Sequence, residues 1–590
     1  MPKTKRPETK MTGAEIVLRA LKDQGVDVIF GYPGGVTLSL YDEIYKQNHI
    51  RHYLCRHEQG CVHAAEGYAR STGKTGVALV TSGPGATNTI TGLANAMMDS
   101  TPLVCFTGQV STSMIGNDSF QEADTTGITR SCTKHNYLVK KTEDLARIIH
   151  EAFHVAGKGR PGPVVIDLPK DVIIGHGEYI GPEQVIHKTY QPKVKGDMAR
   201  IREAVAMIAG AERPILYAGG GVINSGPDAS KLLAEFAHMT GLPCTLTLMG
   251  LGAFPASDKQ FLGMLGMHGT YEANMAMHQS DLIVCVGARF DDRITGRLDK
   301  FAPYAKKIHI DIDPSSINKS VIVDIPIVGD VAHVLEDMIK VWESTKAKID
   351  GTALKNWWKA IDGWRARNCL GYKKNNDLPR PQYVLDRLNK LLKDQNAYVT
   401  TDVGQHQMWA AQYLGFDKPK RLVTSGGLGT MGFGLPAALG VQVAHPDAQV
   451  IVITSDASIQ MNIQELATAT AYGLPIKIVC LNNVALGMVR QWQELFFDKR
   501  YSQTLFDRQP DFVKLVEAYG GKGIRVEKAK DVDGALQAML DHDGLLFLDI
   551  RTEQKENVFP MIVVGAAHNE MIFNSEESES TGADEDVVLA

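Results

Sequence analysis

Apolar runs rich in β-branched residues alternate with amphipathic, helix-like segments along most of this 590-residue chain. The alternation begins near residue 11 and restarts near residues 191 and 375. Buried strands that alternate with helices are typical of doubly wound α/β domains with a parallel sheet. We therefore predict three such domains, at residues 11–185, 191–345 and 375–565, followed by an acidic tail at 566–590.

The first domain opens with a clear helix signal. Thr12 precedes the helix-like segment, and Glu15 stands at the capping-box position. Farther along, a strand runs into the turn Gly83-Pro84-Gly85 ahead of another helix-like segment. Such a turn could bind a phosphate at a helix N-terminus. The same three residues are equally compatible with an ordinary tight turn between a strand and a helix.

The middle domain contains a strand that ends in the glycine triplet at residues 219–221. Such a triplet lets the backbone approach a dinucleotide, but by itself it is a weak signal. A charged segment with a stripe of tryptophans follows at residues 343–380, and we predict a linker helix that packs on the surface. The first and third domains repeat one pattern of segments, which indicates a distant duplication of a six-stranded unit.

Composition narrows the class of protein. Hydrophobic residues make up 44% of the chain and charged residues 22%, with a net charge of −5, which argues against a nucleic-acid surface. No apolar run approaches the roughly 18 residues that span a bilayer. The basic start lacks an apolar core, so a tail fits better than a signal peptide. The eight cysteines are scattered singly, which predicts free thiols and a cytoplasmic location.

Candidate chemistry is concentrated in the third domain. One apolar strand ends at Asp456, a helix-like segment follows, and a second apolar strand ends at Asn483. Strands of a parallel sheet would place both side chains at the same edge. Their oxygens are hard donors that suit Mg²⁺, which in turn binds diphosphates. The segment around Asp456 or the one around Asn483 alone could be an ordinary turn after a strand. Their spacing, with each at the end of a buried strand, favours a metal site.

These residues resemble the motif of thiamine diphosphate enzymes, Gly-Asp-Gly followed after a long spacer by Asn-Asn. Ala457 at the third position is similar to acetolactate synthases in particular, whereas Ser455 departs from the usual glycine. The resemblance implies that Asp456 and Asn483 ligate Mg²⁺ through side-chain oxygens and that Ala485 ligates it through its backbone carbonyl.

Glu58 lies in the segment Arg-His-Glu-Gln-Gly. A glutamate near a helix start is usually a cap or a partner of the helix dipole. The segment, however, resembles the element that carries the cofactor-activating glutamate of thiamine diphosphate enzymes. A carboxyl group bonded to N1′ of the aminopyrimidine favours the imino tautomer, whose 4′-nitrogen removes the C2 proton of the thiazolium ring.

Between about residues 11 and 565 the chain resembles the catalytic, large subunit of acetolactate synthase, also called acetohydroxyacid synthase. The resemblance implies a pyrimidine-binding first domain, a central FAD-binding domain and a diphosphate-binding third domain. It implies that pyruvate is decarboxylated on thiamine diphosphate and that the hydroxyethyl group is ligated to pyruvate or 2-ketobutyrate. The products would be 2-acetolactate and 2-aceto-2-hydroxybutyrate, on the way to branched-chain amino acids. FAD would have a structural or vestigial role.

Further active-site residues follow from the same resemblance. Phe120, Gln121 and Lys170 match catalytic positions of the family, although Phe120 could simply anchor its loop. The residues that match substrate-binding positions are Arg293, Met488 and Trp492. A guanidinium suits bidentate binding of a 2-ketoacid carboxylate. The tryptophan would select the ethyl group of 2-ketobutyrate over methyl, a preference worth about 1–3 kcal/mol.

Cofactor contacts are also implied by the resemblance. Those around thiamine diphosphate are Gly404, Gln405, His406, Gly429, Met431, Ala457 and Ser458. Those around FAD are Arg160, Gly219, Gly220, Gly221, Leu265, Gly266, Met267, His268, Gly287, Arg289, Asp291, Asp311 and Asp330. Met431 matches the residue that holds the cofactor in a bent shape, and core packing is its simpler alternative. Asp311 and Ser316 stand where the family pattern has Glu and Asn.

The resemblance also bears on assembly. In this family one chain holds the pyrimidine ring and another chain holds the diphosphate, so that Glu58 and Asp456 of one site would belong to different subunits. A homodimer or homotetramer is therefore expected, and a small regulatory subunit is a candidate partner. Neither a nucleic acid nor a membrane is expected as a partner.

Three alternative functions remain open. A pyruvate oxidase, or an acetolactate synthase without FAD, shares the thiamine motif; Arg293 and Trp492 favour carboligation, and the glycine triplet favours the FAD-containing form. Glyoxylate carboligase lacks the activating glutamate, so Glu58 argues against it. A non-catalytic scaffold would have no need of Glu58, Asp456 and Asn483.

Overall fold

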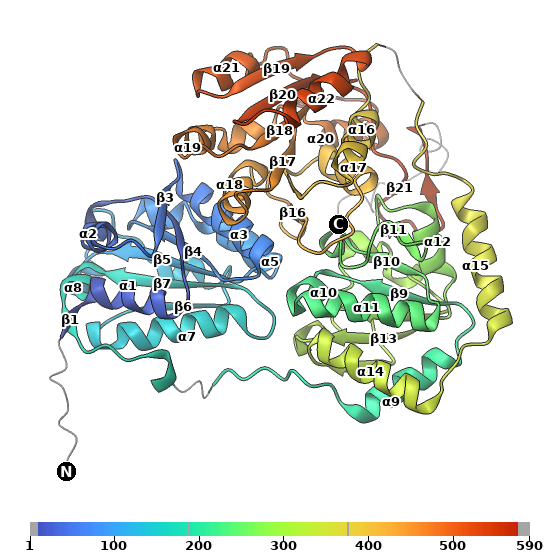
Figure 1. The fold of residues 1–590 in the computed structure, drawn as a ribbon, viewed down its shortest axis with the longest axis horizontal. Coiled ribbons are helices and arrows are strands. Elements are labelled where there is room, and N and C mark those ends of the chain that lie inside the picture. The colour runs from blue at the N-terminus through green and yellow to red at the C-terminus, as the bar shows by residue number, and fades with distance from the viewer. Residues whose placement is uncertain (1–9, 186–188, 374–376, 576–590) are drawn as a thin grey trace.

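A computed structural model describes residues 10–185, 189–373 and 377–575 (Figure 1). Within these ranges three six-stranded, fully parallel sheets are each flanked by helices, which confirms the predicted fold class. The expected basic start, residues 1–9, lies outside the described residues. No helix in the described part of the chain is long and apolar enough to cross a membrane.

The first sheet has the strand order β3-β2-β4-β5-β7-β6. Its strands are β2 (Val28–Gly31), β3 (Arg51–Leu54), β4 (Gly76–Val80), β5 (Leu103–Gln109), β6 (His135–Leu138) and β7 (Pro163–Pro169). The main helices beside it are α1 (Gly13–Asp23), α2 (Leu38–Lys46), α3 (Glu58–Thr72), α5 (Ile90–Met98) and α7 (Leu145–Gly157). The predicted capping box opens α1, because the Glu15 N–H donates to Thr12 Oγ1 (3.2 Å) and the Thr12 N–H donates to Glu15 Oε2 (2.7 Å).

The middle sheet has the order β11-β10-β9-β12-β13-β14. Its strands are β9 (Pro214–Ala218), β10 (Cys244–Leu246), β11 (Phe261–Met264), β12 (Leu282–Val286), β13 (Lys306–Asp311) and β14 (Ile325–Val328). Its main helices are α9 (Met198–Ala209), α10 (Gly220–Ser225), α11 (Pro227–Thr240), α12 (Tyr271–Gln279) and α14 (Val331–Thr345). The direction of winding reverses between β9 and β12, and such a switch point is where open α/β sheets bind ligands.

The predicted linker helix is α15 (Gly351–Arg365), which runs along the outside of the middle domain (Figure 1). Its tryptophan stripe faces this domain: Trp357 Nε1–H donates to the Pro214 carbonyl (3.0 Å) and Trp358 Nε1–H donates to the Gly241 carbonyl (2.9 Å). The buried Trp357 and the half-buried Trp358 therefore attach the linker to the middle domain before the chain enters the third one.

The third sheet has the order β16-β15-β17-β18-β20-β19. Its strands are β15 (Ala397–Thr401), β16 (Leu422–Thr424), β17 (Gln449–Thr454), β18 (Lys477–Asn482), β19 (Lys522–Val526) and β20 (Leu546–Arg551). Its helices are α16 (Pro381–Leu392), α17 (Gln405–Tyr413), α18 (Gly434–Ala444), α19 (Glu465–Ala471), α20 (Gly487–Phe496), α21 (Phe512–Ala518) and α22 (Val532–Leu540). When the strands of each sheet are numbered along the chain, the first and third sheets both read 2-1-3-4-6-5. This shared order supports the predicted duplication.

Helices α3 and α18 pack directly against each other and join the first domain to the third (Figure 1). A β-carbon on Gly67 of α3 would lie 2.0 Å from the Ala437 carbonyl oxygen, and one on Gly440 of α18 would lie 1.8 Å from the Ala64 carbonyl oxygen. Only glycine permits this backbone contact. The crossing places the start of α3, with Glu58, beside the third domain.

The C-terminal segment differs from the sequence prediction. Strand β22 (Met571–Ile572) lies within the range expected to be an acidic tail and pairs antiparallel with β21 (Met561–Ile562). Met561 and Ile572 are fully or almost fully buried, because these apolar residues interrupt the polar sequence and pack into a small cluster of their own. The rest of the expected tail, residues 576–590, lies outside the described residues.

All eight cysteines fall within the described residues, and all are free thiols. Seven are buried, and Cys369 is partly exposed. The prediction of free thiols instead of a disulfide framework is therefore confirmed. Nor do the described ranges contain a group of three or more His, Cys, Asp or Glu side chains placed to hold a metal ion.

Candidate active site

Asp456 and Asn483 follow the adjacent parallel strands β17 and β18 and lie at the same edge of the third sheet. Both residues are buried, at 0% and 5% exposure. Asp456 Oδ1 and Asn483 Oδ1 have no hydrogen-bond partner among the described residues. A buried oxygen without a partner is costly, so two together indicate a missing ligand, and their chemistry fits a hard cation such as Mg²⁺.

Burial also changes the pKa of Asp456 at this edge. It raises the pKa of Asp456 to about 7 when no cation is present, and a hydrogen bond from Gln509 Nε2 to Asp456 Oδ2 opposes the shift. After Asn483 the chain turns at Val484, whose φ of +56° lies in the left-handed region. The turn carries the buried Ala485, at 1% exposure, into a β-bridge with Leu505.

A small cavity of about 50 Å³ adjoins this edge. The predicted residues that line it are Gly404, Gln405, His406, Met431, Ala457, Ser458, Asn483 and Met488. Trp409, Leu486 and Gly487 also line it and were not predicted. A β-carbon at Gly487 would lie 2.2 Å from Gln405 Oε1 and 2.5 Å from Asn483 Nδ2, so a side chain here would displace both of these polar groups.

The turn before α17 could bind phosphate. Gly404, with φ of +150°, is the N-cap of α17, and the first N–H groups of a helix attract anions. His406 Nε2 is buried without a partner among the described residues, and burial lowers the pKa of His406 to about 3. The imidazole is therefore neutral at physiological pH, so only one of its two ring nitrogens carries a proton to donate.

Glu58 begins α3 in the first domain and is half-buried. Its Oε2 accepts a hydrogen bond from Asn88 Nδ2 (3.0 Å). A β-carbon on Gly85 would lie 3.6 Å from Glu58 Oε1, and one on Gly83 would lie 2.7 Å from the Gln121 carbonyl oxygen. Glu58 and Gln121 therefore lie on either side of the Gly83-Pro84-Gly85 turn and both come close to its backbone.

Two other predicted catalytic residues of the first domain face solvent. The Phe120 side chain is 88% exposed on its loop. Lys170 is exposed at the first position of α8 (Lys170–Ile174). Neither side chain is covered by the described part of this single chain.

Glu465 of α19 ties the start of α3 to the third domain. Its Oε1 accepts a hydrogen bond from the Arg56 N–H (2.9 Å), and a β-carbon on Gly60 would lie 2.4 Å from this oxygen. Burial raises the pKa of Glu465. The contact was not predicted, because nothing in the sequence around Glu465 distinguishes it from an ordinary helical glutamate.

Three of the glycines predicted to contact FAD pack together at the switch point of the middle sheet. A β-carbon on Gly219 would lie 2.5 Å from the Gly287 carbonyl oxygen, and one on Gly221 would lie 2.7 Å from Gly287 Cα. Glycine is required where these backbone segments touch, and the switch point of an open α/β sheet is where such folds bind dinucleotides. Residues of the first domain approach it: Arg160 NH1 lies 3.3 Å from Asp313 Oδ2, and Arg289 NH1 donates to the Met98 carbonyl (2.9 Å).

Other predicted FAD residues lie at the ends of neighbouring elements. Asp330 caps α14 and accepts a hydrogen bond from Ser225 Oγ (2.8 Å). Asp311, at the end of β13, accepts a hydrogen bond from the Asp313 N–H (2.8 Å), and burial raises the pKa of Asp311 to about 6. Ser316 is buried nearby.

The loop after β11 connects two predicted substrate residues. The Met267 N–H donates to the Arg293 carbonyl (2.9 Å), and Met267 packs in the same apolar cluster as Trp492 and Phe496. The Arg293 guanidinium is 61% exposed and pairs with Asp292 (2.9 Å). The Arg293 guanidinium therefore faces solvent, while the backbone of Arg293 contacts the loop that carries Met267.

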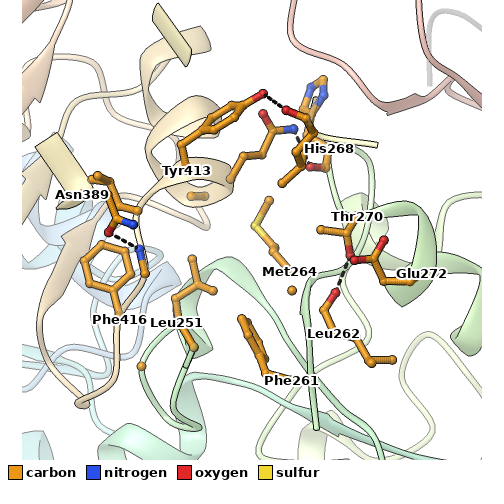
Figure 2. A pocket seen from close by; sticks show the side chains of 18 residues that line it. Leu251, Phe261, Leu262, Met264, His268, Thr270, Glu272, Asn389, Tyr413 and Phe416 are labelled. Carbon is orange, nitrogen blue, oxygen red and sulfur yellow. Dashed lines mark hydrogen bonds between the residues drawn. The ribbon is translucent and has the colours of Figure 1, made fainter. Parts of the chain in front are cut away.

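A larger cavity, of about 280 Å³, lies between β11, α12 and the end of α17 (Figure 2). His268 is the only predicted site residue in its lining. Two of its other polar groups bond to the backbone: Thr270 Oγ1–H donates to the Leu262 carbonyl (2.6 Å) and Tyr413 O–H donates to the Leu370 carbonyl (2.9 Å). Gln412 Oε1, also in the lining, is buried without a partner among the described residues. The smaller cavity is the better candidate for catalysis, because eight of the predicted site residues line it.

Comparisons with known proteins agree with this geometry. Three family profiles match the chain: the N-terminal TPP binding domain of thiamine pyrophosphate enzymes at residues 11–128, their central domain at 201–338, and their C-terminal TPP binding domain at 402–550. The large subunit of acetolactate synthase from Haemophilus influenzae is 50% identical over 574 residues, covering 97% of this chain and 100% of that protein.

Two further relatives show the same similarity. The large subunit of acetolactate synthase isozyme 3 from Escherichia coli is 50% identical over 572 residues, covering 96% of this chain and 99% of that protein. An acetolactate synthase from Mycobacterium bovis is 47% identical over 569 residues, covering 95% of this chain and 91% of that protein. The similarity thus extends over all three domains.

Proposed function

The chain belongs to the thiamine pyrophosphate enzymes and, within them, to the acetolactate synthase large-subunit family, and from this membership we propose its reaction. Pyruvate loses CO₂, and the remaining two-carbon unit is joined to the keto carbon of a second 2-ketoacid. Two molecules of pyruvate give 2-acetolactate, and pyruvate with 2-ketobutyrate gives 2-aceto-2-hydroxybutyrate. Both products lie on routes to branched-chain amino acids.

The observation that carries this proposal is the pair of buried, unpartnered oxygens Asp456 Oδ1 and Asn483 Oδ1 beside a glycine-lined cavity. Together with the Ala485 carbonyl they would hold Mg²⁺. Gly404 and His406 would hold the diphosphate. Thiamine diphosphate supplies an electron sink for decarboxylation when it is bound.

Glu58 would exchange a proton with a nitrogen of the aminopyrimidine ring. Asn88 donates to Glu58 Oε2 and so fixes the plane of the carboxyl group, which leaves Oε1 for that contact. The glycines of the neighbouring turn keep this side of the carboxyl group free of side chains.

The second 2-ketoacid would bind between the first domain and the loop after β11. Arg293 would hold its carboxylate, and the cluster around Trp492 would contact its alkyl group, with Met488 beside the cofactor cavity. Gln121 and Lys170 are the polar groups of the first domain assigned to this space, and Phe120 would close it. These assignments rest on matched family positions and on the contacts described above.

FAD would occupy the switch point of the middle sheet. Gly219, Gly221 and Gly287 pack closely on one another beside this point, and Arg160 reaches it from the first domain. Carboligation has no net change of redox state, so FAD would stabilise the arrangement of the domains and carry no electrons in the reaction.

The working enzyme would contain at least two copies of the chain. Phe120 and Lys170 are uncovered in a single chain, and a second copy whose third domain faces them would complete the site. Relatives are named large subunits, so we include a small regulatory subunit among the proposed partners. Free thiols at all eight cysteines are compatible with the proposed cytoplasmic location.

The test is anaerobic turnover of pyruvate by the purified chain with thiamine diphosphate and Mg²⁺, with and without FAD, measuring acetolactate, acetaldehyde and CO₂. We expect acetolactate, and we expect Glu58→Gln to lose about 10²–10⁴-fold in rate. Glu336→Gln, on the exposed surface of α14, is the matched control and should keep full activity. Acetaldehyde or acetate as the main product would instead favour a decarboxylase or an oxidase.

A further inference from the structure

We propose that Gln509 is a positioning residue that orients the carboxylate of Asp456 toward the metal. The inference rests on the metal role proposed above for Asp456, Asn483 and Ala485, and it adds a second layer of residues to that site. It assigns a task to the loop between α20 and α21, which neither the sequence pattern nor the family resemblance singled out.

The orientation follows from two hydrogen bonds of one amide. Gln509 Nε2–H donates to Asp456 Oδ2, and Gln509 Oε1 accepts from Arg551 NH1 (2.9 Å). Because a guanidinium can only donate, the amide oxygen must face Arg551 and the amide nitrogen must face Asp456. One carboxylate oxygen is thereby occupied, and Oδ1 is left as the free, buried oxygen.

Arg551 is itself held at the end of β20. Its NH2 lies 3.7 Å from Asp549 Oδ2, and Asp549 is fully buried. Asp549 also accepts hydrogen bonds from Asn482 Nδ2 (2.7 Å) and Arg525 Nε (3.0 Å). Asn482 directly precedes the second metal-ligand candidate, so one network links the residues behind both strand ends.

The same loop reaches the third candidate ligand. The Leu486 N–H donates to the Thr504 carbonyl (2.8 Å), the Phe506 N–H donates to the Val484 carbonyl (3.1 Å), and Leu505 bridges to Ala485. The loop therefore supports the backbone of Ala485 and, through Gln509, the side chain of Asp456.

A neutral amide suits this position for an electrostatic reason. A guanidinium placed directly on Asp456 would repel a dication, because both are positive. Gln509 accepts a hydrogen bond from Arg551 and donates one to Asp456, so Arg551 fixes the amide and the amide fixes the carboxylate. The positive charge of Arg551 thereby stays one side chain farther from the metal site. Partners that orient metal ligands typically contribute 10–100-fold to metal affinity.

The experiment is a titration of the full-length protein with Mn²⁺ in the presence of saturating thiamine diphosphate, with free Mn²⁺ measured by electron paramagnetic resonance. We expect Gln509→Leu to raise the Mn²⁺ Kd by about tenfold or more and to change the spectrum of bound Mn²⁺. Gln503→Leu is the matched control, because Gln503 lies exposed on the same loop. It should leave the Kd unchanged.

A double-mutant cycle separates positioning from general loss of structure. Arg551→Met should weaken Mn²⁺ binding, and Arg551→Met combined with Gln509→Leu should weaken it no further than Gln509→Leu alone, because the arginine acts through the amide. Unchanged circular dichroism and Tm of the apo proteins would show that the variants fold.

Three results would overturn the inference. A Gln509→Leu Kd within about twofold of the unmodified protein removes the positioning role, since the expected effect is tenfold. Additive effects in the cycle show that Arg551 acts independently. A failure of the unmodified protein to bind Mn²⁺ with thiamine diphosphate would instead remove the proposed metal site itself, so the two failures are distinguishable.

Discussion

Gly440 of α18 lies so close to Ala64 of α3 that a β-carbon on Gly440 would stand 1.8 Å from the Ala64 carbonyl oxygen. Gly67 of α3 makes the reciprocal contact with Ala437 of α18, at 2.0 Å. The first and third domains are therefore joined by backbone contact between two helices. The atoms nearest each added β-carbon belong to the backbone, so no side chain could rotate away to make room.

We expect Gly440→Ala to destabilise the chain by several kcal/mol, because the helices must separate and lose buried contact along both faces. The Tm and the urea midpoint of the apo protein measure this. Gly534→Ala is the control, because Gly534 lies in α22 with no heavy atom near its added β-carbon. That substitution should stabilise the protein by about 0.5–1 kcal/mol. Equal effects of the two substitutions would contradict the role of the crossing.

Mixing two inactive variants tests whether a site is shared between subunits. Glu58→Gln and Asp456→Asn would each abolish turnover alone. If the two residues of one site come from different chains, then a mixture after subunit exchange contains half heterodimers, each with one intact site, and regains about a quarter of full activity. If both residues come from one chain, no site is intact and the mixture stays inactive.

The affinity for the metal should depend on pH through Asp456. Burial raises the pKa of Asp456 to about 7, and only the carboxylate binds a cation, so affinity is full above pH 7 and is lost as pH falls through that value. We expect the Mn²⁺ Kd to rise by about tenfold between pH 7 and pH 6 at most, with one proton competing. Titrations of Mn²⁺ with free thiamine diphosphate in the same buffers correct for the cofactor's own protonation. A flat Kd from pH 8 to pH 6 would contradict the prediction.

Trp492 should set the preference between the two second substrates. In Trp492→Leu the apolar wall recedes, and we expect the ratio of 2-aceto-2-hydroxybutyrate to 2-acetolactate in competition assays to fall about tenfold, since one methylene is worth about 1–3 kcal/mol. Trp364→Leu, on α15, is the control and should leave the ratio unchanged. A change in overall rate without a change in this ratio would argue against a specificity role for Trp492.

The alternation of strands and helices was sufficient to predict three α/β domains, because buried parallel strands are continuous apolar runs. Local signals were equally readable, as the capping box at Thr12 and Glu15 shows. Strand order was not readable, since 2-1-3-4-6-5 and 3-2-1-4-5-6 differ only in how connections cross the sheet. The boundary at residue 566 was placed too early because a two-residue strand such as β22 has no periodicity to detect.

The candidate site was predictable where residues sit beside strand ends or glycine turns, as Asp456 and Gly404 do. Gln509, Trp409 and Glu465 escaped prediction because their roles depend on tertiary contacts with residues distant in sequence. Only the folded chain brings Gln509 to Asp456, 53 residues away. Second-layer residues of this kind lack a sequence signature of their own.

The reciprocal glycine contacts between α3 and α18 also limit how this gene can recombine. Gly67 packs on the backbone of Ala437, and Gly440 packs on the backbone of Ala64. A side chain at either glycine would push the two helices apart. A chimaera that takes its first domain from one relative and its third from another will keep the crossing only if position 67 of the first parent and position 440 of the second are both glycine. An exchange confined to the middle domain leaves the crossing itself untouched.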